Sequence, residues 1–455
     1  MLIRLLIILA LLLSFAADAP SHRCPPHCLP PEIKMGRLNF TGFESQSNDI
    51  DGYNASFDET TITHGGSRSM KIDSGAGNSA GAVNSKPGIT ILDDSATYVW
   101  FIRGYYYFVD YPNSTVNILD IRTWNGSNGQ LGLEMDSSGK IYAESHQNSR
   151  SGASAAAIPK NQWVRIEIKV TIVLVANTSR QATVDEVRVD GVDQSLTATN
   201  TYLTPNTGGI IFPASGWIQA PGANKIVYVD DLAWNNDQGA EQNSWPGEGK
   251  IIQLLPISDN ARDTKWTGGA GGTTNLYDAV NNTPPIGTAT ETDLTQIEHA
   301  GGAAGTTDRY DANMTTYATA GLTAADTISL MQFVDVDGED ITTGNKLLNF
   351  EVLSNPVMAS PGNVTAGDNI GALGTYPMNW AVHRSAVLYN PTVDVDVSPV
   401  MRARRPETAS RVASVCFMGI YVEYVPAEDN PAPRTGGLSE FTRIVEIGHA
   451  NVKVY

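Results

Sequence analysis

Stretches in which apolar and polar residues alternate recur along most of the chain. The clearest runs from Gln162 to Ala176, where every second residue from Val164 to Leu174 is aliphatic and the residues between them are mainly charged or polar. A period of two places successive side chains on opposite faces of a β-strand. Asn-Gly, Ser-Gly and Asp-Gly turns separate the shorter stretches, a spacing typical of antiparallel meanders. The pattern therefore predicts an all-β protein.

The stretch from Asn224 to Trp234, NKIVYVDDLAW, is predicted to be the closing strand of a large β-sandwich. Simple alternation places Val229 and Asp231 on one face and Asp230 and Leu232 on the other, and both faces carry bulky residues, so we expect a central strand. The first and last strands of a sandwich commonly pair. The expected partner is Arg37 to Glu44, and this pairing delimits a domain from Gly36 to about Asn236.

Further strands of this domain are expected around Met70 and Ile72, and at four other places. The aromatic run from Thr97 to Tyr111 predicts a buried strand with Gly104 at a bulge or bend. The segments VNILDIRTW from Val116, QLGLEMD from Gln130 and KIYAESH from Lys140 are expected to be short strands.

The remaining chain is divided by composition. We expect a leader over residues 1–34, a first jelly roll over 35–237, a linker over 238–249, a second β-sandwich over 250–426 and a C-terminal tail over 427–455. The strands expected in the second sandwich are KIIQLLP from Lys250, Ser329 to Val336, Lys346 to Leu353 and Ala413 to Val425, an early strand pairing with a late one. Long loops rich in Gly, Ala, Thr and Asn are expected at Thr267 to Asn275 and His299 to Ala320.

The first 19 residues have one early Arg, an apolar run and small residues after it, which is the pattern of a signal peptide. A second interpretation is that Met35 is the true start, because a strand is expected directly after it. Both interpretations place residues 1–34 outside the fold. A signal peptide predicts a secreted, extracellular location.

Charge and cysteine content argue against nucleic-acid binding and against a disulfide-stabilised fold. The formal net charge is -18, with a pI near 4.7, and such a surface repels phosphate backbones, so we expect no nucleic-acid partner. Three cysteines cannot form a disulfide framework. Cys416 is expected to be a buried apolar residue, and the spacing of Cys24 and Cys28 with nearby histidines fits no zinc motif.

Three segments, WVRIEIKV from Trp163, VRVDGVD from Val187 and IVYVDDLAW from Ile226, resemble the concanavalin A-like jelly-roll superfamily. The start MGRLNFTGFES and the junction VDDLAWNN to NSWPGEGKI resemble more closely a group of tailed-bacteriophage virion proteins that carry such domains. The resemblance covers roughly residues 35 to 256. It implies two tandem jelly-roll β-sandwiches, the first concanavalin A-like, and it carries no catalytic residue over to this chain.

Candidate chemistry is limited to a few carboxylates. Glycosidases of the resembled fold use an E-x-D-x-x-E strand, and Glu134 and Asp136 match its first two positions, while Ser138 and Gly139 stand where the third carboxylate would fall. We expect no cofactor and assign no metal site. Clustered carboxylates suit calcium, which the resembled lectins often bind, so a bound calcium ion is left open. The clusters are Asp230 with Asp231, Asp335 to Asp340, and Asp394 with Asp396. A G-x-S-x-G match centred on Ser79 is attributed to chance, because no helical pattern follows it.

These observations predict a non-enzymatic structural or decoration protein of a phage exterior, on the head surface or a fibre, with no catalytic residues. The expected partners are other virion proteins and further copies of the chain, most simply in a trimer, since closed symmetry covers every interface. The first alternative is a glycan-binding lectin or receptor-binding tail protein, for which Trp100, Trp124, Trp217 and Trp234 are candidates if they are exposed, although burial is expected for most. The second alternative is a carbohydrate-active enzyme.

Overall fold

The computed structural model describes the parts of the chain in which strands and their turns can be placed. These are residues 37–44, 50–52, 55–75, 83–85, 89–90, 97–123, 129–145, 149–175, 179–203, 210–217, 221–238, 242–268, 274–281, 297–299, 309–339, 348–353, 364–366, 381–387, 398–404 and 413–427. The predicted leader, residues 428–455 of the predicted tail, Ser79, Trp124 and the Asp394–Asp396 pair lie outside the described residues. No helix in the described part has the length and apolar character needed to span a membrane.

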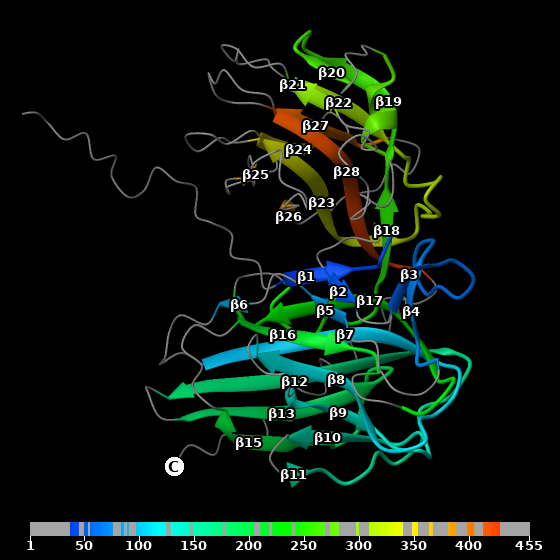
Figure 1. Ribbon diagram of the computed structural model, residues 1–455, viewed down its shortest axis with the longest axis vertical. Coiled ribbons are helices and arrows are strands. Elements are labelled where there is room, and N and C mark those ends of the chain that lie inside the picture. Colours follow the sequence, from blue (N-terminus) through cyan, green and yellow to red (C-terminus); the bar gives the residue numbers. More distant parts are fainter. Residues whose placement is uncertain are drawn as a thin grey trace, which may run out of the picture. The chain divides into compact units, whose positions relative to one another are not determined.

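Two antiparallel sheets contain the strands of the N-terminal half (Figure 1). The nine-stranded sheet has the order β14-β13-β12-β7-β17-β4-β3, with β1 added on β17 and β15 on β13. Its strands are β1 Arg37–Thr41, β3 Ala55–Glu59, β4 Ser69–Asp73, β7 Thr97–Phe108, β12 Trp163–Val175, β13 Ser179–Val189, β14 Val192–Asp193, β15 Ala198–Leu203 and β17 Ile226–Asn236.

The eight-stranded sheet has the order β11-β10-β9-β8-β16-β5-β2, with β6 added on β16. Its strands are β2 Ile50–Gly52, β5 Val83–Ser85, β6 Ile89–Thr90, β8 Val116–Thr123, β9 Gly129–Met135, β10 Ile141–Ser145, β11 Ser149–Arg150 and β16 Ile210–Ser215. The strands predicted from alternation between residues 69 and 175 are all present, with ends that differ by a few residues.

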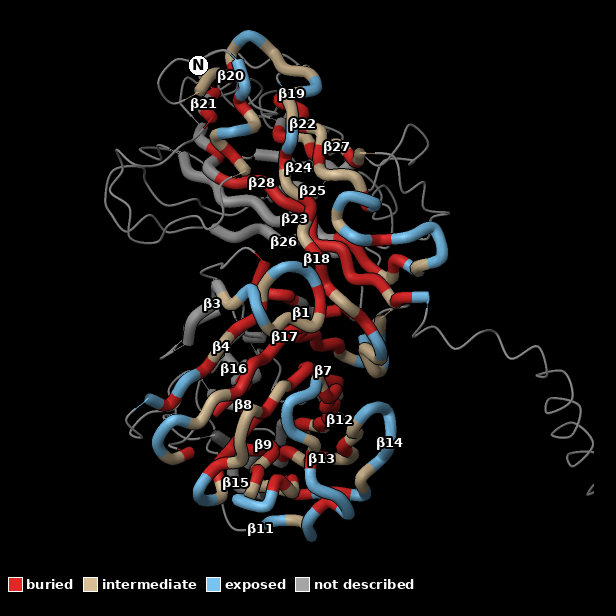
Figure 2. The backbone as a smooth tube through the Cα atoms, turned by 90° about the vertical axis from the view of Figure 1, so that its right-hand side faces the viewer, coloured by how far each residue is buried: buried red, intermediate tan, exposed pale blue. Residues whose placement is uncertain are grey.

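The inward faces of these two sheets share one buried core. Ile166 of β12 and Val229 of β17 belong to the same cluster as Leu133 of β9 and Ile141 of β10, and all four side chains are fully buried. Two sheets packed over such a core form a β-sandwich. Figure 2 shows buried residues running along β17, and only its two end residues are partly exposed.

The closing strand pairs as predicted but does not alternate as predicted. β17 pairs antiparallel with β1, Thr41 lying opposite Leu232. The pairing of β17 with β7 shifts register between Asp230 and Ala233, where Asp231 has a positive φ of 46°. This bulge reverses the faces, so Leu232 joins Val229 in the core. Alternation alone placed Leu232 on the opposite face from Val229.

A second pair of antiparallel sheets contains the strands after the junction. The six-stranded sheet has the order β20-β21-β28-β23-β26 with β18 added on β28, and the five-stranded sheet has the order β19-β22-β27-β24-β25. The elements are β18 Lys250–Leu254, β19 Pro256–Arg262, β20 Trp266–Gly268, the 3-10 helix η1 Leu276–Ala279, β21 Ile297–His299, β22 Arg309–Met314, β23 Thr327–Glu339, β24 Leu348–Leu353, β25 Val364–Ala366, β26 Ala381–Val387, β27 Val400–Arg404 and β28 Ala413–Val425. A separate buried cluster, which includes Trp266, Tyr310 and Ile420, fills this part.

Here the predictions are confirmed in outline and wrong in one detail. The early strand β18 pairs with the late strand β28, as expected. The loop predicted over His299 to Ala320 contains β22, in which Tyr310, Ala312 and Met314 are fully buried. β23 continues through Asp337 and Gly338, so this Asp-Gly pair lies within a strand. The all-β prediction is confirmed, while the division into two tandem jelly rolls at the stated boundaries stays a prediction.

Two buried arginines tie the nine-stranded sheet to the six-stranded sheet. Glu423 of β28 contacts Arg37 of β1 at 2.8 Å and Arg103 of β7 at 2.7 Å, and all three side chains are almost inaccessible to solvent. Burial disfavours the charged carboxylate, but the two guanidinium groups outweigh it and hold the pKa of Glu423 below its ordinary value. This buried ion triad is shielded from the screening that weakens surface pairs.

Candidate functional site

Glu134 and Asp136, the two carboxylates that the sequence singled out, lie at the outer face of the eight-stranded sheet and have different surroundings there. Glu134 lies on β9, partly exposed, whereas Asp136 follows the end of β9 and caps the turn to β10. One oxygen of Asp136 accepts hydrogen bonds from the backbone and hydroxyl of Ser138, at 2.8 and 2.7 Å, and the other accepts one from the hydroxyl of Tyr142 at 2.7 Å. Burial acts against ionisation of Asp136, but these bonds outweigh it and lower its pKa to about 2. Asp136 is therefore a turn residue.

The second carboxylate of this face comes from the neighbouring strand. The β9–β10 hairpin places Tyr142 opposite Glu134 and Glu144 opposite Gly132. Because side chains alternate faces, Glu134, Tyr142 and Glu144 all point outward, away from the core residues Leu133 and Ile141. Glu134 and Glu144 are diagonal neighbours, with Cβ atoms roughly 7 Å apart in regular antiparallel geometry.

Asn117 and Asp120 of β8 complete this face. A register shift between Asn117 and Leu119 inserts one extra residue into β8, so Asn117 lies opposite Glu134 and Asp120 lies opposite Gly132. The amide nitrogen of Asn117 donates a hydrogen bond to Glu144 at 3.1 Å. A Cβ added at Gly132 would fall 2.1 Å from the carbonyl oxygen of Leu119, so only glycine allows the two strands to approach this closely.

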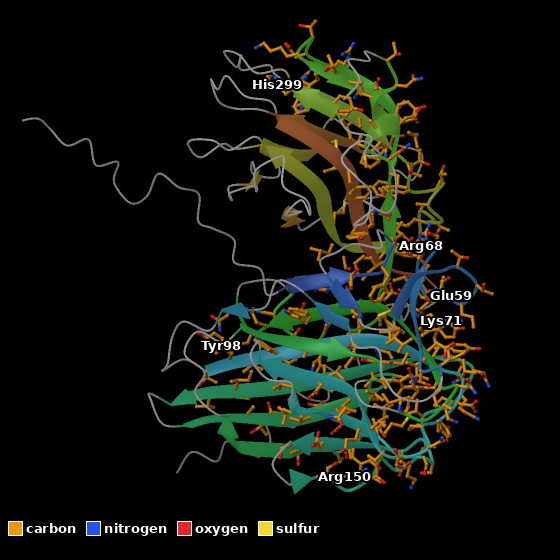
Figure 3. The ribbon with its side chains drawn as sticks, viewed as in Figure 1. Glu59, Arg68, Lys71, Tyr98, Arg150 and His299 are labelled. Atoms are coloured by element: carbon orange, nitrogen blue, oxygen red, sulfur yellow. The ribbon has the colours of Figure 1, made fainter. Side chains whose placement is uncertain are left out.

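Arg150 supplies the positive charge of the site. It lies on β11 at the edge of the eight-stranded sheet (Figure 3), where its guanidinium carbon is 3.5 Å from the centroid of the Tyr142 ring. Its Nε contacts the Glu134 carboxylate at 2.8 Å. Burial raises the pKa of Glu134, Arg150 lowers it, Glu144 raises it, and the net shift is upward. A carboxyl with a raised pKa beside a second carboxylate is an arrangement suited to acid–base chemistry.

Sequence reasoning found Glu134 and missed Glu144. The E-x-D-x-x-E pattern searches one strand, whereas here the partner carboxylate lies across a hairpin. The signal that could have found it is the turn from Asp136 to Gly139, because its length fixes the register and brings Glu144 diagonally to Glu134.

The other candidates from the sequence do not form a site. Trp100, Trp217 and Trp234 are buried in the core of the first sandwich, which confirms their expected burial. Asp230 and Asp231 are fully buried and accept hydrogen bonds from backbone N–H groups and from His64. Among the described residues, no three His, Cys, Asp or Glu side chains are grouped so that they could hold a metal ion. The side chains of Asp335, Asp337, Glu339, Asp340 and Cys416, and the residues Cys24 and Cys28, lie outside what the structure describes.

No family model matches the chain, and no curated protein matches its sequence. Solved structures with a similar fold include the PL-14 alginate lyase of Aplysia kurodai, at 16% identity over 41% of this chain and 90% of the lyase with a TM-score of 0.31. The cellulose induced protein Cip1 matches at 16% identity over 45% of this chain and 99% of its own, with a TM-score of 0.31. A Trypanosoma rangeli sialidase mutant with trans-sialidase activity matches at 15% identity over 44% of this chain and 30% of its own, with a TM-score of 0.29.

These neighbours contradict two predictions. The chain was expected to be a phage decoration protein and not an enzyme, but the similar structures include a lyase and a sialidase, which are enzymes that act on carbohydrates. Both predictions are wrong, because they rested on structural motifs that a jelly roll needs whatever its function. TM-scores this low carry no argument about substrate or reaction, which must come from the side chains of this chain.

Proposed function

We propose that this protein is a carbohydrate-active enzyme that cleaves glycosidic bonds at the carboxylate pair Glu134 and Glu144. The observation that carries the proposal is the placement of these two carboxyls as diagonal neighbours on one partly exposed sheet face, with the pKa of Glu134 raised. Glycosidases need two carboxyl groups flanking the scissile bond, one of them protonated.

The environments of the two residues separate their roles. Glu134, whose pKa is raised mainly by burial, is the general acid and gives its proton to the glycosidic oxygen as the carbon–oxygen bond breaks. Glu144, oriented by the Asn117 amide, either attacks the sugar carbon or takes a proton from the water that does so. The separation of the carboxyl oxygens in a substrate complex distinguishes these two routes, roughly 5 Å for direct attack and 6.5–9.5 Å when water intervenes.

Glycan binding without cleavage is the second candidate function. The observation that favours it is the 2.8 Å contact between Arg150 and Glu134, which engages the oxygen that would carry the proton. In this case Glu134, Tyr142 and Arg150 would hold sugar hydroxyl groups, and no bond would break.

The experiment screens the full chain against a panel of neutral and acidic polysaccharides for new reducing ends, and then compares variants on the best substrate. Glu144→Ala is expected to lose at least about 100-fold in kcat, with recovery on addition of azide, a small anion that replaces the missing carboxylate. Binding without release of reducing ends, weakened by Arg150→Ala, would instead establish the second function. If neither cleavage nor binding depends on this face, both proposals fail.

A further inference from the structure

A row of aromatic residues crosses the outer face of the other sheet of the first sandwich. In the nine-stranded sheet, Tyr107 of β7 lies directly opposite Trp163 of β12 on one side and Tyr228 of β17 on the other. The ring centroids are 5.7 and 5.8 Å apart, and both pairs are edge-to-face. Lys71 of β4 extends the row, because it lies opposite Tyr228. At the ordinary spacing of strands, the row from Trp163 to Lys71 spans roughly 15 Å.

This aromatic row faces away from the core. Its neighbours along β7, Tyr106 and Phe108, are fully buried, whereas Tyr107 and Trp163 are partly exposed. Tyr228 lies outside the core cluster but is 7% exposed, so it supports the ring of Tyr107. No described residue forms a hydrogen bond with the hydroxyl of Tyr107 or of Tyr228. Large aromatic groups on the outer face of a sheet, with polar ends that the protein leaves without a partner, are typical of a ligand surface.

His64 lies at the Trp163 end of the row and is held in one orientation. Its Nδ1 is 2.6 Å from the fully buried carboxylate of Asp231, and its ring stacks on Tyr105 with centroids 3.7 Å apart. It also meets Trp163 edge-to-face at 5.7 Å. Nδ1 is engaged by Asp231, whereas no described residue forms a hydrogen bond with Nε2, which can therefore bond a ligand.

The backbone conformation of β17 orients the side chain of Asp231. Its φ of 46° lies in a region that residues other than glycine seldom adopt, and it is the bulge in β17 that turns its carboxylate toward His64. Its other oxygen accepts a hydrogen bond from the backbone of Ile251 at 2.8 Å. The histidine is therefore positioned by groups that are themselves fixed.

The charge around the row indicates the class of ligand. Glu59 of β3 lies near enough to Lys71 for the two charges to interact, and Figure 3 shows the two labels next to each other beside β3 and β4. The chain as a whole carries a net charge of -18, which repels polyanions. A neutral ligand with apolar ring faces and many hydroxyl groups suits this surface.

We propose that the aromatic row Trp163, Tyr107 and Tyr228, with His64 at its end, is a binding surface for neutral oligosaccharides, separate from the carboxylate pair. Sugar rings pack on the partly exposed side chains of Trp163 and Tyr107, which Tyr228 supports, and a hydroxyl group forms a hydrogen bond with Nε2 of His64. The surface lies on the opposite sheet from Glu134, so it holds a polysaccharide without taking part in its cleavage.

The test uses the full chain carrying Glu134→Gln, so that no probe is cleaved. Cellohexaose, laminarihexaose and maltohexaose are titrated by calorimetry, with a hexamer of uronic acid as the charged comparison. We expect binding of at least one neutral hexamer, weakened at least about tenfold by Tyr107→Ala and by Trp163→Ala, a loss of about 1.4 kcal/mol. Thr171→Ala, on the same strand face as Trp163 but outside the row, is expected to leave binding unchanged.

His64→Asn separates recognition from folding. The indole of Trp163 donates to the carbonyl of Thr63, so Trp163→Ala could disturb the chain around His64, and thermal melting of each variant checks this. His64→Asn is expected to weaken binding. The melting temperature of Tyr107→Ala is expected to stay within error of the parent. The inference is overturned if no neutral hexamer binds at millimolar concentration, or if binding persists undiminished in folded Tyr107→Ala. Absence of cleavage by the wild-type protein would count against the proposed function alone.

Discussion

Glu134 and Asp136 are two residues apart in the sequence, but their pKa values shift in opposite directions because their surroundings differ. Asp136 is nearly solvent-exposed but saturated with hydrogen bonds, so its pKa falls, whereas Glu134 is half-buried and its pKa rises. Sequence alone showed two carboxylates at matching positions. It could not show this difference, since it depends on the turn that follows β9 and on Arg150 from another strand.

Arg150→Ala is expected to shift the pH dependence of cleavage. The general acid works in its protonated form, so activity is lost as pH rises through the pKa of Glu134. Arg150 lowers that pKa, and its removal therefore moves the alkaline limb of the kcat/KM profile to higher pH. Arg150→Lys, which keeps a positive charge, is the control. An alkaline limb that stays in place or moves down would show that Glu134 is not the acid.

Glu44→Gln is expected to flatten the dependence of stability on pH between about 4.5 and 7. Burial raises the pKa of Glu44 to about 7 from an ordinary 4.5, against the hydrogen bonds from Ser67 and Arg68. In this window the folded state binds more protons than the unfolded state, so the free energy of unfolding falls as pH rises, by roughly 3 kcal/mol for this group. Urea unfolding at several pH values measures the slope. A slope identical in the wild type and the variant would contradict the shift.

At the scale of elements, alternation predicted strand positions well, and bulges account for the main errors. The period of two located β7, β9, β10, β12 and β28 to within a few residues. It could not place the extra residues in β17 and β8, because a bulge arises from pairing with a distant strand. The bulges lie at Asp231 and beside Asn117, residues that the two proposed sites use. The sequence therefore missed the geometry of the sites where it missed the bulges.

Val229→Asp tests the assignment of the closing strand. Val229 is fully buried in β17 between Tyr106 of β7 and Met70 of β4, and an unpaired carboxylate there costs several kcal/mol, a large part of a total stability of about 5–15 kcal/mol. The first sandwich is expected to unfold. Val192→Asp is the matched control, because Val192 is 64% exposed. A melting temperature of Val229→Asp equal to that of the control would refute the burial of this strand.

At the scale of the whole molecule, the sequence predicted that domain-closing strands pair across long separations, and the structure confirms β1 with β17 and β18 with β28. It gave no sign of the buried triad of Arg37, Arg103 and Glu423, whose members are up to 386 residues apart, from 37 to 423. Single charged residues within apolar strands look alike in sequence whether they pair or face solvent.

Glu423→Gln is expected to lower the free energy of unfolding by about 3 kcal/mol, because it leaves two buried guanidinium groups beside a neutral amide. The midpoint of urea unfolding measures the loss. Glu186→Gln is the control, since its pair with Arg188 is partly exposed and contributes less than about 1 kcal/mol. Equal midpoints for the two variants would mean that the triad does not hold the sheets together.

The most direct test of the account compares kcat for release of reducing ends by Glu134→Gln and by Asp136→Asn on the same polysaccharide. The two changes are alike in chemistry and lie two residues apart. The account predicts that Glu134→Gln loses at least about 100-fold while folded Asp136→Asn stays within about threefold of wild type, because only Glu134 supplies a proton. Equal losses in the two variants, or full activity in Glu134→Gln, would contradict the assignment of this sheet face as the active site.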